Sequence, residues 1–276
     1  MPLVLLDFDG TITESDSLNS LVHSAISHSP SLSLESKTWT SIVKAWLSDH
    51  ESHVAAYSPP GESRLTPEAE LSFLESLKPL ERASVERVEK AGFFEGLNEE
   101  IMEELGREAV KSGDVKVREG FRELVKEIGQ REWEVGVVSV NWSRGWVRGV
   151  MDVEVDGAVI NSIGEDGKIR GPDVEGFEKE RMVLTAGDKL EATKVLVKEK
   201  GGGKWMYLGD STTDMACLLE ADVGVVVAQG ERSKLLQTLR RLGFEVRRVR
   251  EGRAGLVWAR DFEEVLKGGV LDWLRD

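Results

Sequence analysis

The chain opens with Pro2-Leu3-Val4-Leu5-Leu6, which runs directly into Asp7-Phe8-Asp9-Gly10-Thr11-Ile12-Thr13. A short aliphatic run of this kind is typical of a strand that is buried on both faces of a parallel sheet. The predicted strand ends at two carboxylates two positions apart, followed by Gly and Thr, which suit a tight polar loop. Because open α/β sheets bind ligands beyond the carboxyl ends of their strands, this stretch predicts a reactive site.

The composition limits the class of protein. The 276 residues are 40% hydrophobic and 31% charged, which suits one large domain or a core with a smaller module. A formal net charge of −14 argues against nucleic acid or an anionic membrane as a partner, since both attract basic proteins. Cys217 is the single cysteine, so no internal disulfide can form, and a reducing compartment is expected. The apolar start is too short for a signal peptide or a membrane span, and we therefore expect a soluble cytoplasmic protein.

The pattern changes after the opening stretch. Residues 16–112 show helical periodicity and no convincing strand. Thr66 followed by Pro67 is a good start signal for one of these helices. The predicted helices cover 18–26, 39–47, a segment that begins at 66 and a segment at 98–111, with a Ser/Pro-rich linker at 27–36. This block is interpreted as a helical insertion.

Beyond about residue 113, helices and strands alternate, as in α/β proteins. Predicted strands cover 133–140, 205–208, 223–227 and 244–249, and predicted helices cover 118–129, 188–200, 215–221, 233–242 and 262–266. Short β-like runs at 153–155, 158–160 and 168–170 are separated by Gly-containing turns, which predicts a hairpin. The predicted fold is a doubly wound parallel sheet, interrupted after its first strand by the helical insertion.

Three predicted strands end in residues that can carry chemistry. These are Asp7 and Asp9 after the first strand, Ser139 after the second, and Asp210 with Asp214 after the third, joined by Lys189 at the start of a helix. Two like charges about 4 Å apart repel by about 4 kcal/mol at an effective dielectric near 20, so converging carboxylates need a compensating cation. The candidate ligands are all oxygens and no histidine lies in these segments, which favours Mg²⁺ over zinc.

These motifs resemble the haloacid dehalogenase superfamily of aspartate-nucleophile phosphohydrolases. DFDGT at 7–11, the strand ending in Ser139, Lys189 and GDSTTD at 209–214 occur in the order found in that superfamily. The resemblance covers 1–15 and 113–276, which implies a Rossmann-like core, and residues 16–112 match an inserted helical cap. The segments SDSL, VVSVNWS, DKLEATKVL and GDSTTDMACLLEADVGVVV are further similar to phosphatases of the phosphoserine-phosphatase type and to plant and fungal thiamine-monophosphate phosphatases.

The resemblance implies a role for each motif residue. Asp7 would attack phosphorus and form an aspartyl-phosphate, and Asp9 would act as general acid and then general base. The implied ligands of the substrate are Thr11, Ser139, Asn141 and Lys189, with Asp16 placed to contact a substrate cation; the implied metal ligands are Asp7, Asp9 through its carbonyl, Asp210 and Asp214. Dehalogenases lack a carboxylate two residues after the nucleophile, so Asp9 favours phosphate-ester chemistry.

Several residues also have simpler explanations. Lys179 and Lys194 compete with the predicted phosphate-binding lysine, and a serine that follows a strand often caps the next helix. The last Asp of GDSTTD could merely stabilise the first turn of its helix. His50 and His53 are expected to have a surface or helix-packing role rather than to bind a metal, and Trp142 is a candidate for stacking on a substrate ring.

The sequence thus predicts a Mg²⁺-dependent phosphomonoester hydrolase whose cap closes over a small soluble phosphorylated metabolite. One alternative is a phosphotransferase or phosphomutase that uses the same aspartyl-phosphate. Another is a binding protein that keeps the fold without turnover, and the presence of both Asp7 and Asp9 argues against it.

Overall fold

The computed structural model describes residues 1–28, 36–178, 180–252 and 255–274. Within these residues, seven parallel strands form one sheet in the order β3-β2-β1-β6-β7-β9-β8. Its strands are β1 (Leu3–Leu6), β2 (Glu134–Ser139), β3 (Gly157–Ile160), β6 (Trp205–Gly209), β7 (Val223–Val227), β8 (Arg247–Arg248) and β9 (Leu256–Ala259). The opening stretch is therefore a buried strand, as predicted, and it lies between β2 and β6.

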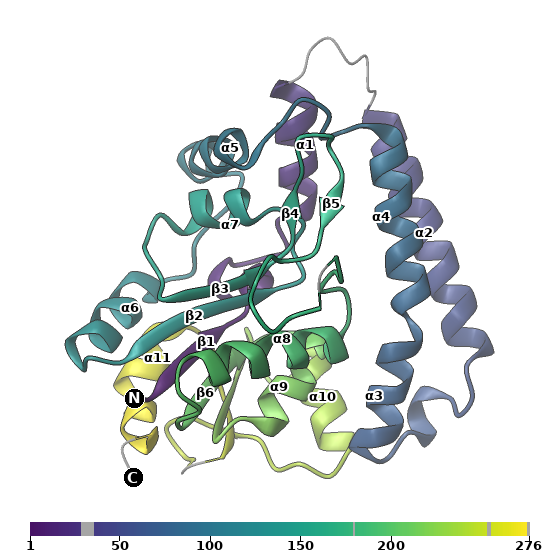
Figure 1. Ribbon diagram of the computed structural model, residues 1–276. Coiled ribbons are helices and arrows are strands. Elements are labelled where there is room, and N and C mark those ends of the chain that lie inside the picture. Colours follow the sequence, from purple (N-terminus) through teal and green to yellow (C-terminus); the bar gives the residue numbers. More distant parts are fainter. Residues whose placement is uncertain (29–35, 179, 253–254, 275–276) are drawn as a thin grey trace.

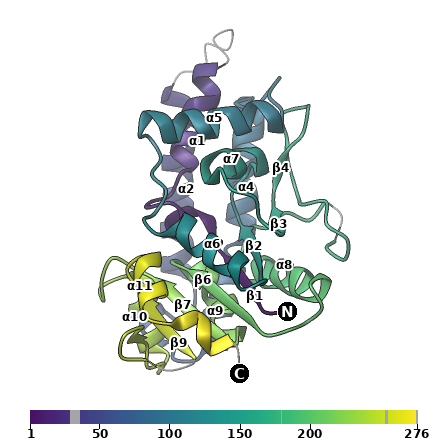
Figure 2. The same ribbon diagram turned by 90° about the vertical axis from the view of Figure 1, so that its left-hand side faces the viewer.

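Helices cover both faces of the sheet (Figures 1 and 2). They are α6 (Phe121–Gln130), α7 (Arg144–Met151), α8 (Ala186–Glu199), α9 (Met215–Glu220), α10 (Lys234–Arg241) and α11 (Phe262–Lys267). Successive side chains of a strand point to opposite faces, so Leu3 and Leu5 pack with α8, α9 and α10, whereas Val4 and Leu6 pack with α6 and α11. This arrangement confirms the predicted doubly wound α/β fold.

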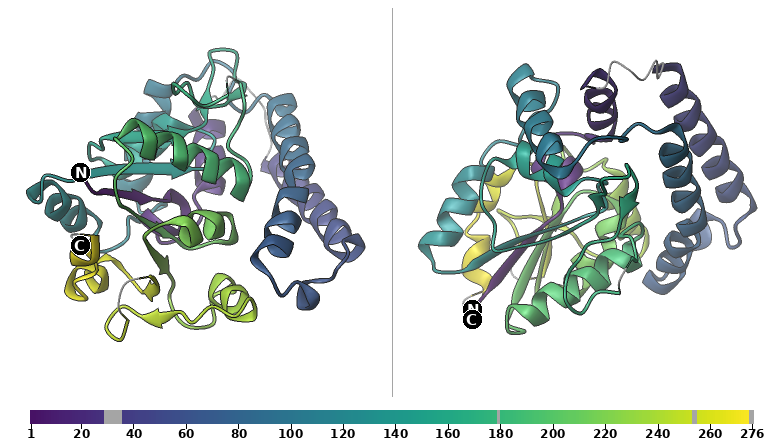
Figure 3. Two further views of the ribbon diagram at one scale, coloured as in Figure 1. Left: turned by 60° about the horizontal axis from the view of Figure 1, so that its bottom comes forward. Right: turned by 45° about the horizontal axis from the view of Figure 1, so that its top comes forward.

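The chain between β1 and α6 is helical. It forms α1 (Leu18–His28), α2 (Ser36–Ala56), a 3-10 turn (Gly61–Ser63), α3 (Pro67–Ser76), α4 (Lys78–Ala91) and α5 (Glu99–Ser112). Figure 1 and the two views of Figure 3 show α2 and α4 running side by side along the core, with α3 at their lower end. The predicted linker at 27–36 lies mostly outside the described residues. None of the described helices combines the length and the apolar character that crossing a membrane requires.

Close helix packing fixes α5 of the insertion to α7 of the sheet region. A Cβ at Gly149 would lie 1.9 Å from the carbonyl oxygen of Glu103, and one at Gly145 would lie 2.0 Å from that of Glu99. Only glycine allows the two backbones to approach this closely. The insertion is therefore attached to the core through helix packing as well as through the chain itself.

The hairpin prediction for residues 152–174 was partly wrong. The run at 153–155 is not a strand, and the run at 158–160 lies in β3, which pairs in parallel with β2 at the edge of the main sheet. The antiparallel ribbon is instead formed by β4 (Ser162–Ile163) and β5 (Ile169–Arg170). β3 is a short edge strand in which only the last two residues are buried, so its sequence resembles that of a hairpin strand.

Candidate active site

The nucleophile loop, residues 7–13, follows β1 at the carboxyl edge of the sheet. Its backbone turns sharply at Gly10, which has φ +77°, and a Cβ there would lie 2.3 Å from Oδ2 of Asp210. A side chain at this position would therefore be both strained and obstructed. Ser139 ends β2 and Asp210 follows β6, so the sheet register brings the three predicted strand ends together.

Lys189 joins two of the acidic residues. Its Nζ lies 2.5 Å from Oδ1 of Asp7 and 2.6 Å from Oδ1 of Asp214, and its side chain is fully buried. Although burial disfavours the charged ammonium, the charges of Asp214 and Asp7 raise the pKa of Lys189. Of the competing lysines, Lys194 pairs with Glu220 in a half-exposed position, and Lys179 lies outside the described residues.

Within the described residues, Asp7, Asp210 and Asp214 form a group that could hold a metal ion, with one oxygen of each within 4.8 Å of the others. Burial, followed by the charge of Asp214, raises the pKa of Asp7 well above its usual value and that of Asp210 to about 7. These shifts mean that the positive charge near the carboxylates does not balance their negative charge in the protein alone. An all-oxygen donor set with a deficit of positive charge fits a hard divalent cation such as Mg²⁺.

Asp214 organises this group. Its Oδ2 accepts hydrogen bonds from the backbone N–H groups of Asp210 (3.1 Å) and Ser211 (3.0 Å) and from the Ser211 hydroxyl (3.1 Å). Its Oδ1 accepts from Lys189 and from the Tyr207 hydroxyl at 2.9 Å. A carboxylate offers about four acceptor positions, so these donors leave no free lone pair for a metal. The geometry thus favours a role in which Asp214 supports the metal site over one in which it binds the metal directly. Asp214 also completes a capping box with Ser211, which agrees with the simpler explanation that it stabilises the first turn of its helix.

Asp9 lies in a separate hydrogen-bonding environment. Its Oδ1 accepts from the backbone N–H of Ser17 at 2.8 Å and its Oδ2 accepts from Nδ2 of Asn141 at 2.7 Å. Burial, followed by the charge of Asp16, raises the pKa of Asp9 to about 6. Asp16 is itself exposed and accepts from the backbone N–H of Leu18, where α1 begins. A carboxyl group with a pKa near neutrality suits proton transfer in both directions.

The remaining predicted phosphate ligands lie at the same edge of the sheet. Ser139 is fully buried, and its Oγ accepts a hydrogen bond from the backbone N–H of Asn141 at 3.1 Å. It does not cap α7, because Ser143 does so. Thr11 is also buried, and its hydroxyl donates to Oδ1 of Asp210 at 3.3 Å. The structure therefore brings these residues together but gives the Thr11 and Asn141 side chains acidic partners.

Trp142 lies between the site and the inserted helices. Its ring makes edge-to-face contacts with Trp39 at 6.3 Å and with Phe94 at 6.5 Å between centroids, and only 7% of the residue is exposed. The predicted stacking on a substrate ring stays a prediction, since this ring is mainly occupied in joining the insertion to the loop after β2.

Of the two histidines of α2, His50 packs on a residue of its own helix and His53 contacts α3, which agrees with the expected surface or helix-packing role. The His50 ring stacks on Trp46 with 5.2 Å between ring centroids. His53 forms a hydrogen bond of 2.7 Å with the hydroxyl of Ser76 in α3.

Some residues of the site were not predicted from the sequence. Asn161 holds the loop after β2, because its Nδ2 donates to the carbonyls of Val140, Asn141 and Val183. It directly follows β3, so the rule that located Ser139 could have located Asn161 had this strand been assigned to the main sheet. Tyr207 and Arg118 carried no comparable signal.

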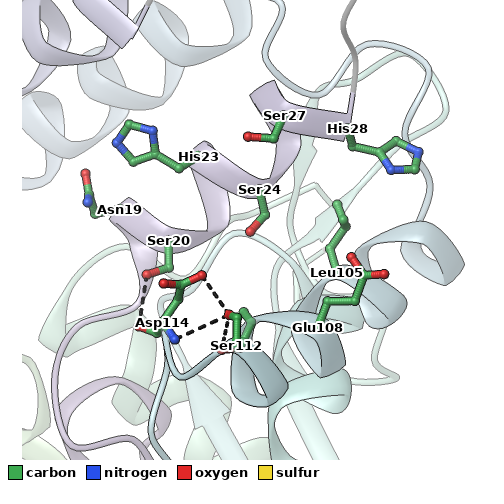
Figure 4. A pocket seen from close by; sticks show the side chains of 11 residues that line it. Asn19, Ser20, His23, Ser24, Ser27, His28, Leu105, Glu108, Ser112 and Asp114 are labelled. Carbon is green, nitrogen blue, oxygen red and sulfur yellow. Dashed lines mark hydrogen bonds between the residues drawn. The ribbon is translucent and has the colours of Figure 1, made fainter.

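A hollow of about 630 Å³ lies away from these residues, between α1 and α5. Figure 4 shows His23 and His28 on one side and Glu108 on the other, with Ser112 bonded to Asp114 below. None of the predicted site residues is among the described residues that line it.

The chain belongs to the family of haloacid dehalogenase-like hydrolases, which it matches over residues 4–219. The predicted resemblance to this family is therefore confirmed. The chain is 23% identical over 247 residues to the CTO1 family protein C17G9.12c of Schizosaccharomyces pombe, with 83% of each chain covered. It is 26% identical over 269 residues to the Bifunctional TH2 protein, mitochondrial, of Arabidopsis thaliana, covering 87% of this chain and 41% of that protein. A solved substrate-bound phosphoserine phosphatase shares the fold, with a TM-score of 0.53, 19% identity and 96% of both chains covered.

Proposed function

We propose that this protein is a Mg²⁺-dependent phosphomonoester hydrolase that acts on a small phosphorylated metabolite. The observation that carries the proposal is the arrangement around Asp7. Its Oδ1 lies 2.5 Å from the buried ammonium of Lys189, and Asp7 belongs to a group of three carboxylates within 4.8 Å. A second carboxyl group, Asp9, stands apart from that group with a pKa of about 6. The loop thus supplies a nucleophile and an acid–base group two residues apart.

The reaction proceeds in two displacements. An oxygen of Asp7 attacks phosphorus while the bond to the leaving oxygen breaks, and Asp9 gives its proton to that oxygen. Asp9 then takes a proton from a water molecule, which attacks the phosphorus, breaks the acyl-phosphate bond and releases inorganic phosphate. Lys189 offsets the negative charge of the phosphoryl oxygens, and Ser139 helps to hold these oxygens in place. Bound Mg²⁺, held by Asp7, the Asp9 carbonyl and Asp210, supplies positive charge to these carboxylates and to the phosphoryl group.

Substrate recognition involves the insertion. In this proposal residues 16–112 form a cap over a core of 1–15 and 113–276, and closure of the cap excludes water from the acyl-phosphate. Asp16 lies beside Asp9 at the entrance to the cap, where it contacts a positively charged group of the substrate. The cytoplasmic location inferred from the single cysteine stays a prediction.

Replacement of the nucleophile tests the proposal. Asp7→Asn should lower kcat for p-nitrophenyl phosphate by at least about 1,000-fold, because removal of a covalent nucleophile removes the first step. Asp166→Asn, the same change in a half-exposed loop of the β4–β5 ribbon, should keep the wild-type kcat. EDTA should abolish turnover and added Mg²⁺ should restore it. Full activity of Asp7→Asn would exclude the nucleophile assignment.

The same preparation separates the alternatives. A panel of phosphorylated metabolites, including thiamine monophosphate, phosphoserine and nucleotides, is incubated with Mg²⁺ and a competing alcohol. A hydrolase releases inorganic phosphate, whereas a phosphotransferase or mutase yields a phosphorylated organic product. Absence of turnover across the panel supports a binding protein.

A further inference from the structure

Arg118 is a buried arginine whose guanidinium serves the nucleophile loop. Its Nη2 donates to the carbonyl oxygens of Gly10 (2.5 Å) and Thr13 (3.1 Å), and its Nε donates to that of Thr11 (2.8 Å). Its Nη1 donates to the carbonyl of Arg260 at 3.4 Å. Only 6% of the residue is exposed, and no carboxylate among the described residues lies within ion-pair distance of it.

A buried cation without a carboxylate partner is costly unless its donors are satisfied. Arg118 satisfies them with backbone carbonyls, most of which come from one sharp turn. Carbonyls in such a turn have no partners in the sheet, so the arginine and the loop satisfy one another. The guanidinium fork thereby fixes the path of the backbone from Gly10 to Thr13 by holding three of its carbonyl groups.

The opposite side of the same turn contacts Asp210. The space beside Gly10 is filled by the Asp210 carboxylate, which a Cβ would approach to 2.3 Å. The hydroxyl of Thr11 also donates to that carboxylate. The turn is therefore held between Arg118 on one side and Asp210 on the other, and its position decides how far Asp7 lies from Asp210.

Arg118 also lies where the insertion joins the core. Its backbone N–H donates to the carbonyl of Ile12 at 2.7 Å, and the neighbouring Val117 forms a bridge with Thr13. The segments that leave and re-enter the core are thus paired directly beside the nucleophile loop.

We propose that Arg118 is a positioning residue that holds the nucleophile loop so that Asp7 and Asp210 can share one cation. The inference rests on the proposed function of these carboxylates. It predicts that loss of the guanidinium weakens Mg²⁺ binding and the chemical step together, while binding of the phosphate ester changes little.

The test compares Arg118→Ala and Arg118→Lys with Arg64→Ala. Arg64 is an equally buried control, 5% exposed, that pairs with Glu70 far along the insertion. Arg118→Ala should raise the calorimetric dissociation constant of Mg²⁺ about 10- to 100-fold and lower kcat by a similar factor, with KM for p-nitrophenyl phosphate within about threefold. Added methylguanidine supplies a guanidinium in place of the one removed, and it should raise the kcat of Arg118→Ala about tenfold. Arg64→Ala should lower the thermal unfolding midpoint and leave Mg²⁺ affinity and kcat unchanged.

Arg118→Lys keeps the positive charge but cannot donate to the same three carbonyls. It is the variant to measure if Arg118→Ala does not fold. It should bind Mg²⁺ about tenfold more weakly than the wild type. Wild-type Mg²⁺ affinity in the folded Arg118 variants, or equal losses in Arg64→Ala, would overturn the inference, as would a wild type that binds no Mg²⁺. A wild type that binds Mg²⁺ without hydrolysing any ester would refute the proposed function, while the calorimetry would still decide the role of Arg118.

Discussion

Asp7 and Asp9 are two residues apart, yet their partners give them different chemistry. Asp7 contacts the ammonium of Lys189, whereas Asp9 contacts the neutral amide of Asn141 and the backbone of Ser17. The ammonium favours the ionised form of Asp7, which a nucleophile needs, although burial and the charge of Asp214 keep the pKa of Asp7 above its usual value in the protein alone. Neutral donors around a buried carboxyl leave its pKa near 6, which suits a group that must both give and take a proton.

Replacing Asp9 should therefore affect substrates according to their leaving group. Asp9→Asn cannot donate a proton, so kcat/KM for an alkyl phosphate should fall by about 100- to 10,000-fold. The loss for p-nitrophenyl phosphate should be much smaller, because p-nitrophenolate leaves without protonation. The measurement is the ratio of kcat/KM for the two substrates in wild type and variant.

Asn141→Ala provides the matched control, since it removes the orienting amide but keeps the carboxyl group. It should lower both rates by a similar, smaller factor. Equal losses for the two substrates in Asp9→Asn would show that this residue acts through structure rather than as the general acid.

Among the elements, four neighbouring strands of the sheet were predictable because their signals are local. β1, β2, β6 and β7 are apolar runs, and in β1, β2 and β6 the run meets a polar residue at its carboxyl end, which located most of the site. α4 was missed because Leu77, the single residue between α3 and α4, keeps helical φ and ψ and gives no stop signal. β9 was not predicted, and of the strand predicted at 244–249 only the two residues of β8 are a strand.

The contacts that assemble the site were not predictable, because they join residues far apart in the chain. Arg118 reaches Gly10 across 108 positions and Lys78 reaches Asp188 across 110. Neither pair has a period, a cap or a turn that marks it. An isolated arginine or lysine in a sequence is most simply taken as solvated, and only the three-dimensional packing shows otherwise.

The start of α8 carries one such contact. Asp188 completes the cap of this helix with Thr185, and its Oδ1 accepts from Lys78 of α4 at 2.6 Å and from Arg181 at 2.7 Å. Although burial acts in the opposite direction, hydrogen bonds from Lys78 and Arg181 lower the pKa of Asp188. The stabilisation is therefore complete above the unfolded-state pKa, about 4, and is lost as the pH falls through the lower folded-state value.

Asp188→Asn should reduce the free energy of unfolding by about 1–3 kcal/mol at pH 7, and the difference from wild type should narrow below about pH 4. Urea denaturation at pH 7, 5 and 3 measures both effects. As a control, Glu220→Gln breaks the half-exposed ion pair between Glu220 of α9 and Lys194 of α8. It should change the free energy of unfolding by less than about 1 kcal/mol. A difference that stays constant down to pH 3 would mean that the charge of Asp188 contributes nothing.

For the whole molecule, the insertion is attached to the sheet region at its far end as well as where the chain crosses. The distal segment, residues 57–78, lies beside α8 and α10 (Figures 1 and 3). Phe73 and Leu74 belong to the same hydrophobic cluster as Leu3 and Leu5 of β1. The buried Glu70 also forms an ion pair at 2.6 Å with the partly exposed Arg241 of α10. An insertion held in this way cannot move away from the sheet as one body unless the distal segment detaches.

Weakening the distal attachment should therefore loosen that segment alone. Arg241→Met removes one partner of Glu70, which keeps its 2.7 Å contact with Arg64, so the local opening free energy should fall by about 1–2 kcal/mol. Amide hydrogen exchange in α3 should then accelerate about 5- to 30-fold, while exchange in β1 and β6 stays unchanged. Arg240→Met is the control, because Arg240 lies on the same helix as Arg241 but pairs with the exposed Glu231 before that helix, and it should leave α3 unaffected. Equal acceleration in the sheet strands would contradict this prediction, because it would mean that the distal segment unfolds only together with the core.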